Sequence, residues 1–399
     1  KPDFDLMMTA GVNHIFFHGS CYSPKDIPWP GWRFYASIDM TPANNWWSAM
    51  PEFSKYIERV QSMMQYGCPD NDLLVYLPYY DMISEQPGRF LQFDIHTMYK
   101  KAPRFIESIN NIISAGYDCD YISDKYLSQC VLKNKKIEVG GTSYAAIVIP
   151  NVRYMTTETL GHLLHLAKQG ARVVVKGNLP MSPPGFGRKG EQEKFTSLIH
   201  KLQKYVVTDF GCKIESMRTK GLSVIRRKNE EGYHYFVSNL QGKDVDEWIA
   251  LGRHADDAMF FNPMNGDITR AALKNENGKS SVRMQLASGE SIILVIKSGK
   301  TKGPIQFWPK SISAEPHSYI GKVTSEITNM SFDFKFTKVN DSIPKGTTAG
   351  KWSLDNGNMD WTRFGSTELA EIMATGKYST TFDIKNLHFH SNKKNQKYK

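Results

Sequence analysis

Two kinds of apolar spacing divide the first half of the chain into helices and strands. Apolar residues recur every three or four positions where helices are predicted, at 51–66, 102–115 and 156–169. Short apolar runs, typical of strands that are buried on both faces, lie at 72–78, 145–150 and 171–180. Because these strands alternate with helices, 69–211 is predicted to be a wound α/β domain with a parallel sheet.

The spacing changes to alternation after residue 211. Apolar and polar residues alternate through 223–240, 259–271 and 281–297, with a hairpin across Glu231 and Gly232. This pattern predicts an antiparallel β-sandwich at 212–298. Beyond it, 299–399 begins with a linker and holds two strand-like segments, WSLDNGNMDW and GKYSTTFDI. A jelly roll needs about eight strands, so we expect an incomplete jelly-roll or galactose-binding-like β domain there.

The first 68 residues follow the order helix, strand, loop, helix. A helix ends at Gly11, the apolar run HIFFH at 14–18 predicts a short buried strand, and a loop rich in Pro and Trp leads to the helix at 51–66. An α/β barrel has this order, and its active site is built by the loops after the carboxyl ends of the strands. We therefore predict that 1–68 is the C-terminal end of a (β/α)8 catalytic barrel and that the loop after His18 is functional.

Charge and cysteine content change this picture little. The net charge is +10 and the pI is about 9.1, but the last nine residues alone carry four lysines. No basic helical stripe and no nucleic-acid-binding motif occurs in the sequence, so we expect no nucleic-acid partner. We also expect no membrane span, because no run of 18 apolar residues occurs in the sequence. The five cysteines form no CxxC pair, which predicts free, buried thiols.

The loop after the predicted strand concentrates polar and aromatic side chains. By the two-residue period of a strand, His14 and His18 share a face with Phe16. Polar groups of this kind bind sugar hydroxyls, and exposed aromatic rings stack on sugar rings. The candidate substrate-binding residues are Asn13, His14, His18, Tyr22, Trp29 and Trp32. Two alternatives stay open: core histidines with a loop packed on its own aromatic residues, or a non-catalytic carbohydrate-binding or assembly protein that uses the Trp-rich loop 29–47.

The same segment carries a family resemblance. The runs GVNHIFFHGSCYSP, PGWRFYASIDMTPANNWW and YIERVQSMMQYG resemble glycoside hydrolase family 106, the α-L-rhamnosidases. The resemblance continues in order through PDNDLLVYLPYYD, YDCDYISDKYL, AAIVIPNVRYMTTETL and GARVVVKGNLP, and it covers about 1–300. It implies a large multidomain glycosidase in which a catalytic (β/α)8 TIM barrel precedes β-sandwich modules.

The resemblance also implies a chemistry. Members of this family release α-L-rhamnose from plant polysaccharides, including pectic glycans, by inverting hydrolysis with two carboxylates and a calcium ion near the sugar. Such substrates imply a periplasmic or extracellular location. Asn13, His14, His18 and Tyr22 match the family's final strand loop. The acid and base are expected upstream of Lys1, so no catalytic residue is assigned, and this chain alone is expected to have little or no activity. No Asp or Glu cluster has calcium-ligand spacing.

A second resemblance concerns 69–211, which is similar to the amidotransferase-like domain that follows the barrel in some β-galactosidases. True amidotransferases need a nucleophilic cysteine in a tight strand-to-helix turn. The turn after 145–150 reads NVRYM and holds no cysteine, so we expect a structural role. The pair His162 and His165 is expected to pack against a sheet rather than bind a metal.

Overall fold

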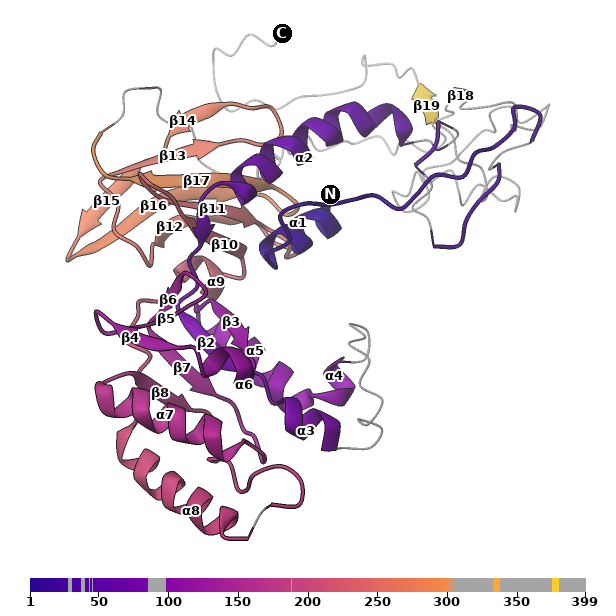
Figure 1. Cartoon of the computed structure of the whole chain (residues 1–399). Coiled ribbons are helices and arrows are strands. Elements are labelled where there is room, and N and C mark those ends of the chain that lie inside the picture. The colour runs from indigo at the N-terminus through magenta and orange to yellow at the C-terminus, as the bar shows by residue number, and fades with distance from the viewer. Residues whose placement is uncertain are drawn as a thin grey trace, which may run out of the picture. The chain divides into compact units, whose positions relative to one another are not determined.

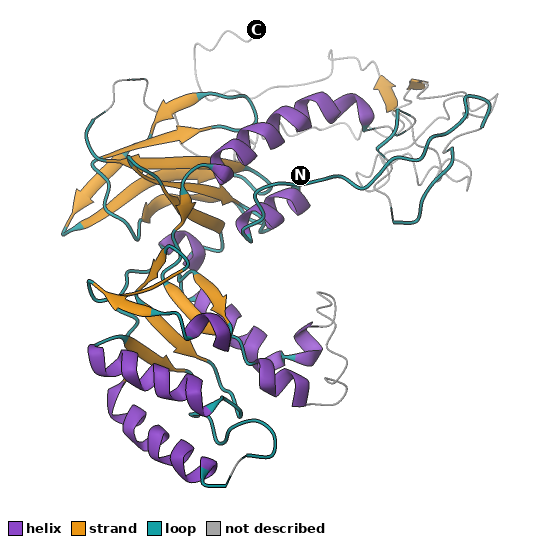
Figure 2. Cartoon of the chain, in the orientation of Figure 1, coloured by secondary structure: helices purple, strands orange, loops and turns teal. Residues whose placement is uncertain are grey.

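The computed structural model describes most of the chain up to residue 300 and short segments beyond it. The described residues are 1–27, 31–36, 40–42, 44, 46–84, 98–187, 189–300, 303, 333–337 and 375–379. Their contacts group into two units, one formed by 1–14 with 56–312 and the other by 15–55 with 313–399. Most of the helices and strands belong to the first unit (Figures 1 and 2).

A five-stranded parallel sheet forms the centre of 69–211, and it confirms the predicted strands. Its strands are β2 (Leu73–Tyr76), β3 (Cys119–Ile122), β7 (Ala146–Ile149), β8 (Arg172–Val175) and β9 (Val206–Val207). Their order across the sheet is β3-β2-β7-β8-β9. The strand β3, which follows β2 in sequence, lies on one side of β2 in the sheet, and the later strands β7, β8 and β9 lie on its other side. The strand order therefore reverses between β2 and β7, as in open doubly wound sheets.

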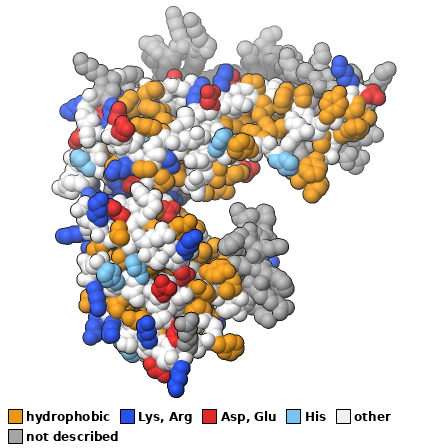
Figure 3. All heavy atoms as spheres, viewed as in Figure 1, with side chains coloured by type: hydrophobic (Ala, Val, Ile, Leu, Met, Phe, Trp, Pro, Cys, Tyr) orange, Lys and Arg blue, Asp and Glu red, His pale blue; other side chains and the backbone are white. Residues whose placement is uncertain are grey.

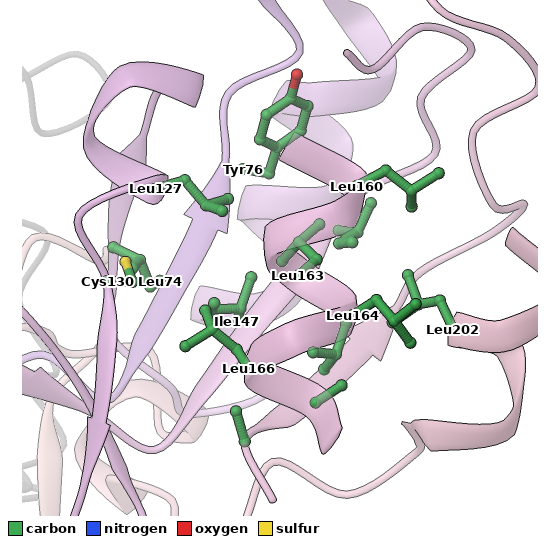
Figure 4. Close-up of a cluster of buried hydrophobic side chains, with 14 of the residues drawn as sticks. Leu74, Tyr76, Leu127, Cys130, Ile147, Leu160, Leu163, Leu164, Leu166 and Leu202 are labelled. Carbon is green, nitrogen blue, oxygen red and sulfur yellow. The ribbon is translucent and has the colours of Figure 1, made fainter. Parts of the chain in front are cut away.

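Helices cover both faces of this sheet. They are α3 (Tyr79–Ser84), α4 (Met98–Lys101), α5 (Pro103–Ser114), α6 (Asp124–Leu127), α7 (Thr157–Gln169) and α8 (Glu191–Leu202). In β2, Leu74 and Tyr76 join the core formed with α7 and α8, whereas Leu73 and Val75 join the core formed with α5. Figure 4 shows Leu74 and Tyr76 in one cluster with Leu163 of α7. Alternate residues thus face opposite helix layers, which explains the continuous apolar run.

Both ends of α7 carry residue types that commonly cap helices. The Thr156 hydroxyl accepts a hydrogen bond from the Thr159 amide at 3.0 Å and so caps the first turn. Gly170 ends the helix in the left-handed conformation, with φ of +104°. The predicted helix at 156–169 is therefore confirmed together with both of its boundaries.

Several parts of this stretch were not predicted, among them a helix and a small antiparallel sheet. The helix α8 places its apolar residues at helical spacing, Phe195, Leu198, Ile199 and Leu202, and all four belong to or contact the core under α7. A three-stranded antiparallel sheet consists of β4 (Val131–Lys133), β5 (Lys136–Val139) and β6 (Thr142–Tyr144). Its first turn uses Asn134 and Lys135, both with positive φ.

Two antiparallel sheets are built from the residues after 211, and the larger also includes the short strand β1 from before the parallel sheet. The larger has the order β1-β10-β11-β17-β13-β14 and the smaller the order β12-β16-β15. The strands are β1 (Cys68–Pro69), β10 (Ser223–Lys228), β11 (Gly232–Ser238), β12 (Val245–Ala250), β13 (Asp257–Phe261), β14 (Ile268–Arg270), β15 (Leu273–Glu276), β16 (Lys279–Leu286) and β17 (Ser291–Lys297). Both sheets contribute to one core, in which Tyr235 and Leu294 of the larger lie with Ile249 and Met284 of the smaller. The hairpin predicted at Glu231 and Gly232 is formed by β10 and β11.

Two helices lie against the larger antiparallel sheet, and a buried carboxylate joins them to it. They are α1 (Pro2–Thr9) and α2 (Met50–Gln65), which confirm the predicted helices before Gly11 and at 51–66. Asp5 of α1 is fully buried and accepts hydrogen bonds from the Tyr56 hydroxyl at 2.5 Å and the Ser238 hydroxyl at 2.8 Å. The Tyr56 oxygen also lies 2.7 Å from the Ser291 hydroxyl of β17.

The segment between α1 and α2 corrects one prediction. Residues 12–24 contain neither helix nor strand, so the strand predicted at 14–18 is wrong for this structure. A strand needs hydrogen-bond partners on a neighbouring strand, and none of the described strands pairs with this segment. Closure of a barrel is therefore not seen in the described residues.

The last hundred residues are described only in part. Within them β18 (Asp333–Thr337) and β19 (Thr375–Ser379) form an antiparallel pair. The remaining residues of the predicted jelly-roll or galactose-binding-like stretch, including the segment WSLDNGNMDW, lie outside the described residues. Among the helices that the structure describes, every one falls short of the length and apolar character needed to cross a bilayer.

Candidate functional site

The predicted site residues fall on both units of the chain. Asn13 and His14 belong to the first unit, and His18, Tyr22 and Trp32 belong to the second. All five are exposed, which contradicts the alternative of a pair of core histidines. Trp29 lies outside the described residues. The structure thus leaves these polar and aromatic side chains open to a ligand, and the site they form together stays a prediction.

Asn13 is placed by the helix that follows in sequence. The Gln65 side chain, at the end of α2, donates a hydrogen bond from Nε2 to the Asn13 carbonyl oxygen at 2.9 Å. This bond uses the backbone of Asn13 and leaves its exposed carboxamide available for a sugar hydroxyl. The segment that follows α1 is therefore fixed at its first residues by α2.

His18 lies among aromatic rings within the second unit. Its ring meets the ring of Phe34 edge-on, with centroids 5.8 Å apart and an interplanar angle of 79°. Phe34 in turn contacts Tyr35 at 4.8 Å, and Phe17 contacts Phe53 of α2 at 6.5 Å. The loop is thus packed in part on its own aromatic residues, as one alternative reading of the sequence expected. The run Arg33-Phe34-Tyr35 was the available signal for these neighbours of His18.

Short polar contacts hold the turns of this loop. The Ser20 hydroxyl donates to the Met40 carbonyl at 2.6 Å, and the Ser23 hydroxyl accepts from the Trp32 amide at 2.8 Å. Gly31 has φ of +79°, and a Cβ atom there would lie only 2.5 Å from the Ser23 oxygen. Only glycine meets both conditions, so the turn that presents Trp32 depends on Gly31.

Several aromatic side chains of this loop are open to solvent. Tyr22 is 85% exposed, Tyr35 96% and Trp32 56%. The space-filling view shows hydrophobic side chains gathered over the loop that precedes α2 (Figure 3). Exposed tyrosine and tryptophan rings combine an apolar face with a polar edge, which suits contact with the C–H face and the hydroxyls of a sugar.

The described residues supply no convincing place for a calcium ion. No group of three or more His, Cys, Asp or Glu side chains converges as metal ligands in the parts of the chain that the structure describes. Calcium requires six to eight oxygen ligands. The donor set described here does not fit the ion, and no catalytic step is derived through it.

The parallel sheet has a small cavity where a ligand of a doubly wound fold usually binds. It measures about 170 Å³ and opens at the carboxyl ends of β2 and β7, between Asp81, Phe105 and Asn151. The Asp81 carboxylate already accepts hydrogen bonds from the amides of Arg153 and Tyr154, at 2.7 and 2.8 Å. These bonds tie α3 to the turn after β7 and give Asp81 a structural role.

No activated thiol accompanies this cavity. All five cysteines are free, as predicted, but only Cys130 is buried and Cys68 is exposed. Burial raises the pKa of Cys130 to about 11, and burial together with nearby carboxylates raises the pKa values of Cys119 and Cys212 to about 12. These three thiols are protonated near neutral pH and are poor nucleophiles, in keeping with a structural role for this part of the chain.

The polar groups of this stretch are engaged in hydrogen bonds, and His165 is exposed rather than packed against a sheet as expected. A ring nitrogen of His162 lies 3.0 Å from the Cys130 carbonyl, and His165 lies 3.2 Å from the Gln169 side chain. Asp120 in β3 accepts hydrogen bonds from Asn71 and Tyr144, both at 2.8 Å. The atoms that make these hydrogen bonds are therefore already occupied within the protein.

Comparison with known proteins places the chain among the glycoside hydrolases. Residues 1–228 match the model of family 106, described as alpha-L-rhamnosidase. This match covers more than half of the chain, and the chain belongs to glycoside hydrolase family 106, the α-L-rhamnosidase family.

Individual relatives are more distant. A protein of Formosa agariphila named "Putative beta-glucuronidase" is 25% identical over 314 residues, which are 74% of this chain and 25% of that protein. A solved rhamnosidase from Novosphingobium sp. PP1Y is 16% identical with a TM-score of 0.58, over 84% of this chain and 32% of that one. The latter likeness shows a shared fold. A β-galactosidase from Rahnella sp. R3 reaches a TM-score of only 0.31, at 8% identity over 61% of this chain and 44% of that one. The chain spans between a quarter and a third of the length of the first two relatives.

Proposed function

We propose that this chain is part of an enzyme that releases α-L-rhamnose from pectic plant polysaccharides by inverting hydrolysis. The family match over 1–228 carries the proposal, and the exposed loop after α1 supports it. Within the proposal, 1–68 contributes the end of a (β/α)8 barrel, and the antiparallel sheets after 211 form a β-sandwich module. The protein acts in the periplasm or outside the cell, where such polysaccharides occur.

The residues of the loop take substrate-binding roles in this proposal. Tyr22 and Trp32 stack on the apolar face of a sugar ring, and Trp29 is a further proposed substrate-binding residue. Asn13, His14 and His18 bind hydroxyl groups. Inversion needs an acid and a base about 6.5–9.5 Å apart, with room for a water molecule between them. The proposal assigns neither role to a residue of this chain, and a calcium ion near the sugar belongs to it only as an expectation from the family.

Binding and turnover test separate parts of the proposal. Affinity electrophoresis of the 399-residue chain in gels with rhamnose-containing pectin should show retardation. Turnover is measured on a protein that contains this chain together with an acid and a base, with 4-nitrophenyl α-L-rhamnoside and 4-nitrophenyl β-D-glucuronide. The rhamnoside should be cleaved, with β-L-rhamnose as the first product detected by NMR. Cleavage of the glucuronide alone, or a first product of retained configuration, would overturn the proposed reaction.

A second candidate is a non-catalytic carbohydrate-binding or assembly protein. It would use the Trp-rich loop 29–47, and the strong exposure of Tyr35 in that loop favours it, because exposed aromatic rings bind a polysaccharide without any acid or base. Retardation in pectin gels, combined with absence of turnover even in the longer protein, would support this candidate over the enzyme.

A further inference from the structure

A cluster of charged side chains is buried where the parallel sheet meets the larger antiparallel sheet. We call it the Arg226 cluster; it consists of Asp70, Asp72, Asp118, Glu215, Arg218, Arg226 and Arg253, all in the first unit. Arg226 of β10 is only 1% exposed. Its guanidinium donates from Nε to the Asp70 carboxylate at 2.6 Å and from Nη2 to the Asp72 carboxylate at 2.7 Å. The cluster therefore joins β10 to the residues that lead into β2.

Two further arginines complete the ion pairs. Arg253, after β12, donates from Nη2 to Asp72 at 2.6 Å and from Nε to Asp70 at 3.1 Å. Arg218, in the short helix α9 (Ser216–Thr219), is paired with Asp118 at the start of β3. Each of the three aspartates thus has at least one close arginine partner.

Glu215 is the carboxylate with the weakest partner. Its nearest guanidinium atom is Nη1 of Arg226 at 3.4 Å, and the Gly252 amide donates to its carboxylate at 3.2 Å. It is 1% exposed. The charged or titratable groups that act on it from the surrounding elements are Arg226 of β10, Tyr235 of β11, Asp118 before β3 and Arg253 after β12.

The charges of the cluster do not balance. Three arginines face four carboxylates, which leaves one negative charge in excess when all seven groups are ionised. An uncompensated charge in a buried site is strongly unfavourable, and the binding of a proton removes it. Asp70, Asp72 and Asp118 each have a closer guanidinium partner than Glu215 has, so Glu215 is the carboxylate with the least compensation and takes the proton.

We propose that the Arg226 cluster keeps a proton on Glu215 in the folded protein, and that release of this proton weakens the packing between the parallel sheet and the larger antiparallel sheet. Burial, only partly offset by Arg226, raises the pKa of Glu215 to about 7 from an ordinary value of 4.5. Burial, only partly offset by Arg218 and Arg226, also raises the pKa of Asp118.

The sign of the pH effect follows from the raised pKa. The folded protein binds the Glu215 proton more tightly than the unfolded chain does. This stabilisation is complete below pH 4.5 and is lost as the pH rises through about 7. The difference between the two pKa values corresponds to a change of about 300-fold in the folding equilibrium constant.

Thermal unfolding of the full chain between pH 5.5 and 8.5 tests the proposal. The melting temperature of the wild type should fall across this range, and that of Glu215→Gln, an uncharged replacement, should change far less. Glu247→Gln is the matched control, because Glu247 pairs with Lys220 at the surface; it should follow the wild type. Equal slopes for wild type and Glu215→Gln would overturn the proposal.

Two measurements on the wild type test the proposal even if Glu215→Gln does not fold. Infrared spectroscopy should detect the carbonyl stretch of a buried protonated carboxyl group at pH 6 and its loss at pH 8.5. Hydrogen exchange, corrected for intrinsic rates, should show peptides 69–76 and 223–228 less protected at pH 8.5 than at pH 6, with little change at 157–169. Absence of the infrared band, or unchanged protection at both sheet edges, would contradict the proposal.

Discussion

The Arg226 guanidinium donates to the Asp72 carboxylate at 2.7 Å although 154 residues separate them in the chain. The two side chains are 1% and 7% exposed, and one belongs to an antiparallel strand while the other leads into a parallel one. A buried pair of this kind contributes less by its attraction than by the penalty that follows when one partner is removed. The contact thus makes the two sheets depend on each other.

Arg226→Ala should destabilise the chain strongly. The substitution leaves Asp70 and Asp72 with Arg253 alone as their guanidinium partner, and removal of one member of a buried pair costs about 3–5 kcal/mol. Arg172→Ala is the matched control, because Arg172 pairs with Asp209 at the surface at 2.6 Å; it should cost about 1 kcal/mol or less. Urea unfolding followed by circular dichroism measures both. Similar midpoints for the two variants would refute the buried-pair argument.

Tyr56→Phe should weaken the attachment of α1 to the sheet. The phenol donates to the buried Asp5 at 2.5 Å, and burial together with the Asp5 charge raises the pKa of Tyr56, so it stays a donor. Loss of this bond should cost about 1–3 kcal/mol. Tyr66→Phe serves as the control, since the Tyr66 hydroxyl has no partner among the described residues; its effect should stay within about 0.5 kcal/mol. Urea unfolding measures both variants, and equal midpoints for Tyr56→Phe and Tyr66→Phe would contradict this prediction.

Gly67→Ala and Gly278→Ala separate backbone conformation from crowding. Both glycines have positive φ, +69° and +71°, so alanine at either should cost about 1–2 kcal/mol. Only at Gly67 would the new Cβ also meet an obstacle, the Lys228 carbonyl oxygen at 2.2 Å; Gly278 has open space. Gly67→Ala should therefore lower the melting temperature clearly more. If both variants lowered the melting temperature equally, the backbone at the junction of α2 and β1 would be able to shift and accommodate the new Cβ without loss of stability.

Asp70 should make the chain sensitive to acid. Burial alone would raise the pKa of this carboxyl, but Arg226 and Arg253 outweigh it and hold the pKa below the ordinary 3.8. The resulting stabilisation is present above pH 3.8 and is lost as the pH falls through the lower folded value. Asp70→Asn should be less stable at pH 6 and lose less on acidification, as measured by circular dichroism between pH 2 and 6. The surface variant Asp209→Asn should lose as much stability on acidification as the wild type. Parallel curves of stability against pH for all three proteins would contradict the expectation.

Tyr22→Ala and Trp32→Ala should weaken binding to rhamnose-containing pectin. Removal of one stacked ring costs about 0.5–1.5 kcal/mol, which corresponds to a loss of roughly 2- to 10-fold in affinity. Phe186→Ala removes a fully exposed ring from the loop before α8 and should leave binding unchanged. Equal losses in all three variants would point to general apolar contact rather than to a sugar site.

Local patterns made much of the fold predictable. The spacing of apolar residues predicted α7, and the short apolar runs predicted β2, β7 and β8, because these signals lie within a few residues of one another. The same kind of signal marks α8, where Phe195, Leu198, Ile199 and Leu202 repeat at helical spacing.

Features that depend on distant residues could not be predicted. HIFFH has the composition of a strand, yet a strand also requires a neighbour, and composition does not supply one. The Arg226 cluster joins acids near residues 70 and 118 to arginines beyond 217, and nothing local marks them as partners. At the candidate site, the residue types of His18, Tyr22 and Trp32 suggested their exposure to ligand, but the contact of His18 with Phe34 depends on how the loop folds back.

The Asp5–Tyr56–Ser291 contacts also bear on how the chain folds during synthesis. Tyr56 and Ser291 are 235 residues apart, and Ser238, the other sheet partner of Asp5, follows Asp5 by 233 residues. At about 5–20 residues per second, the ribosome makes the strands that receive α1 roughly 10–50 s after α1 itself. The parallel sheet, complete by Val207, emerges within that interval. The first helix of this chain is therefore among the last elements to reach its final place.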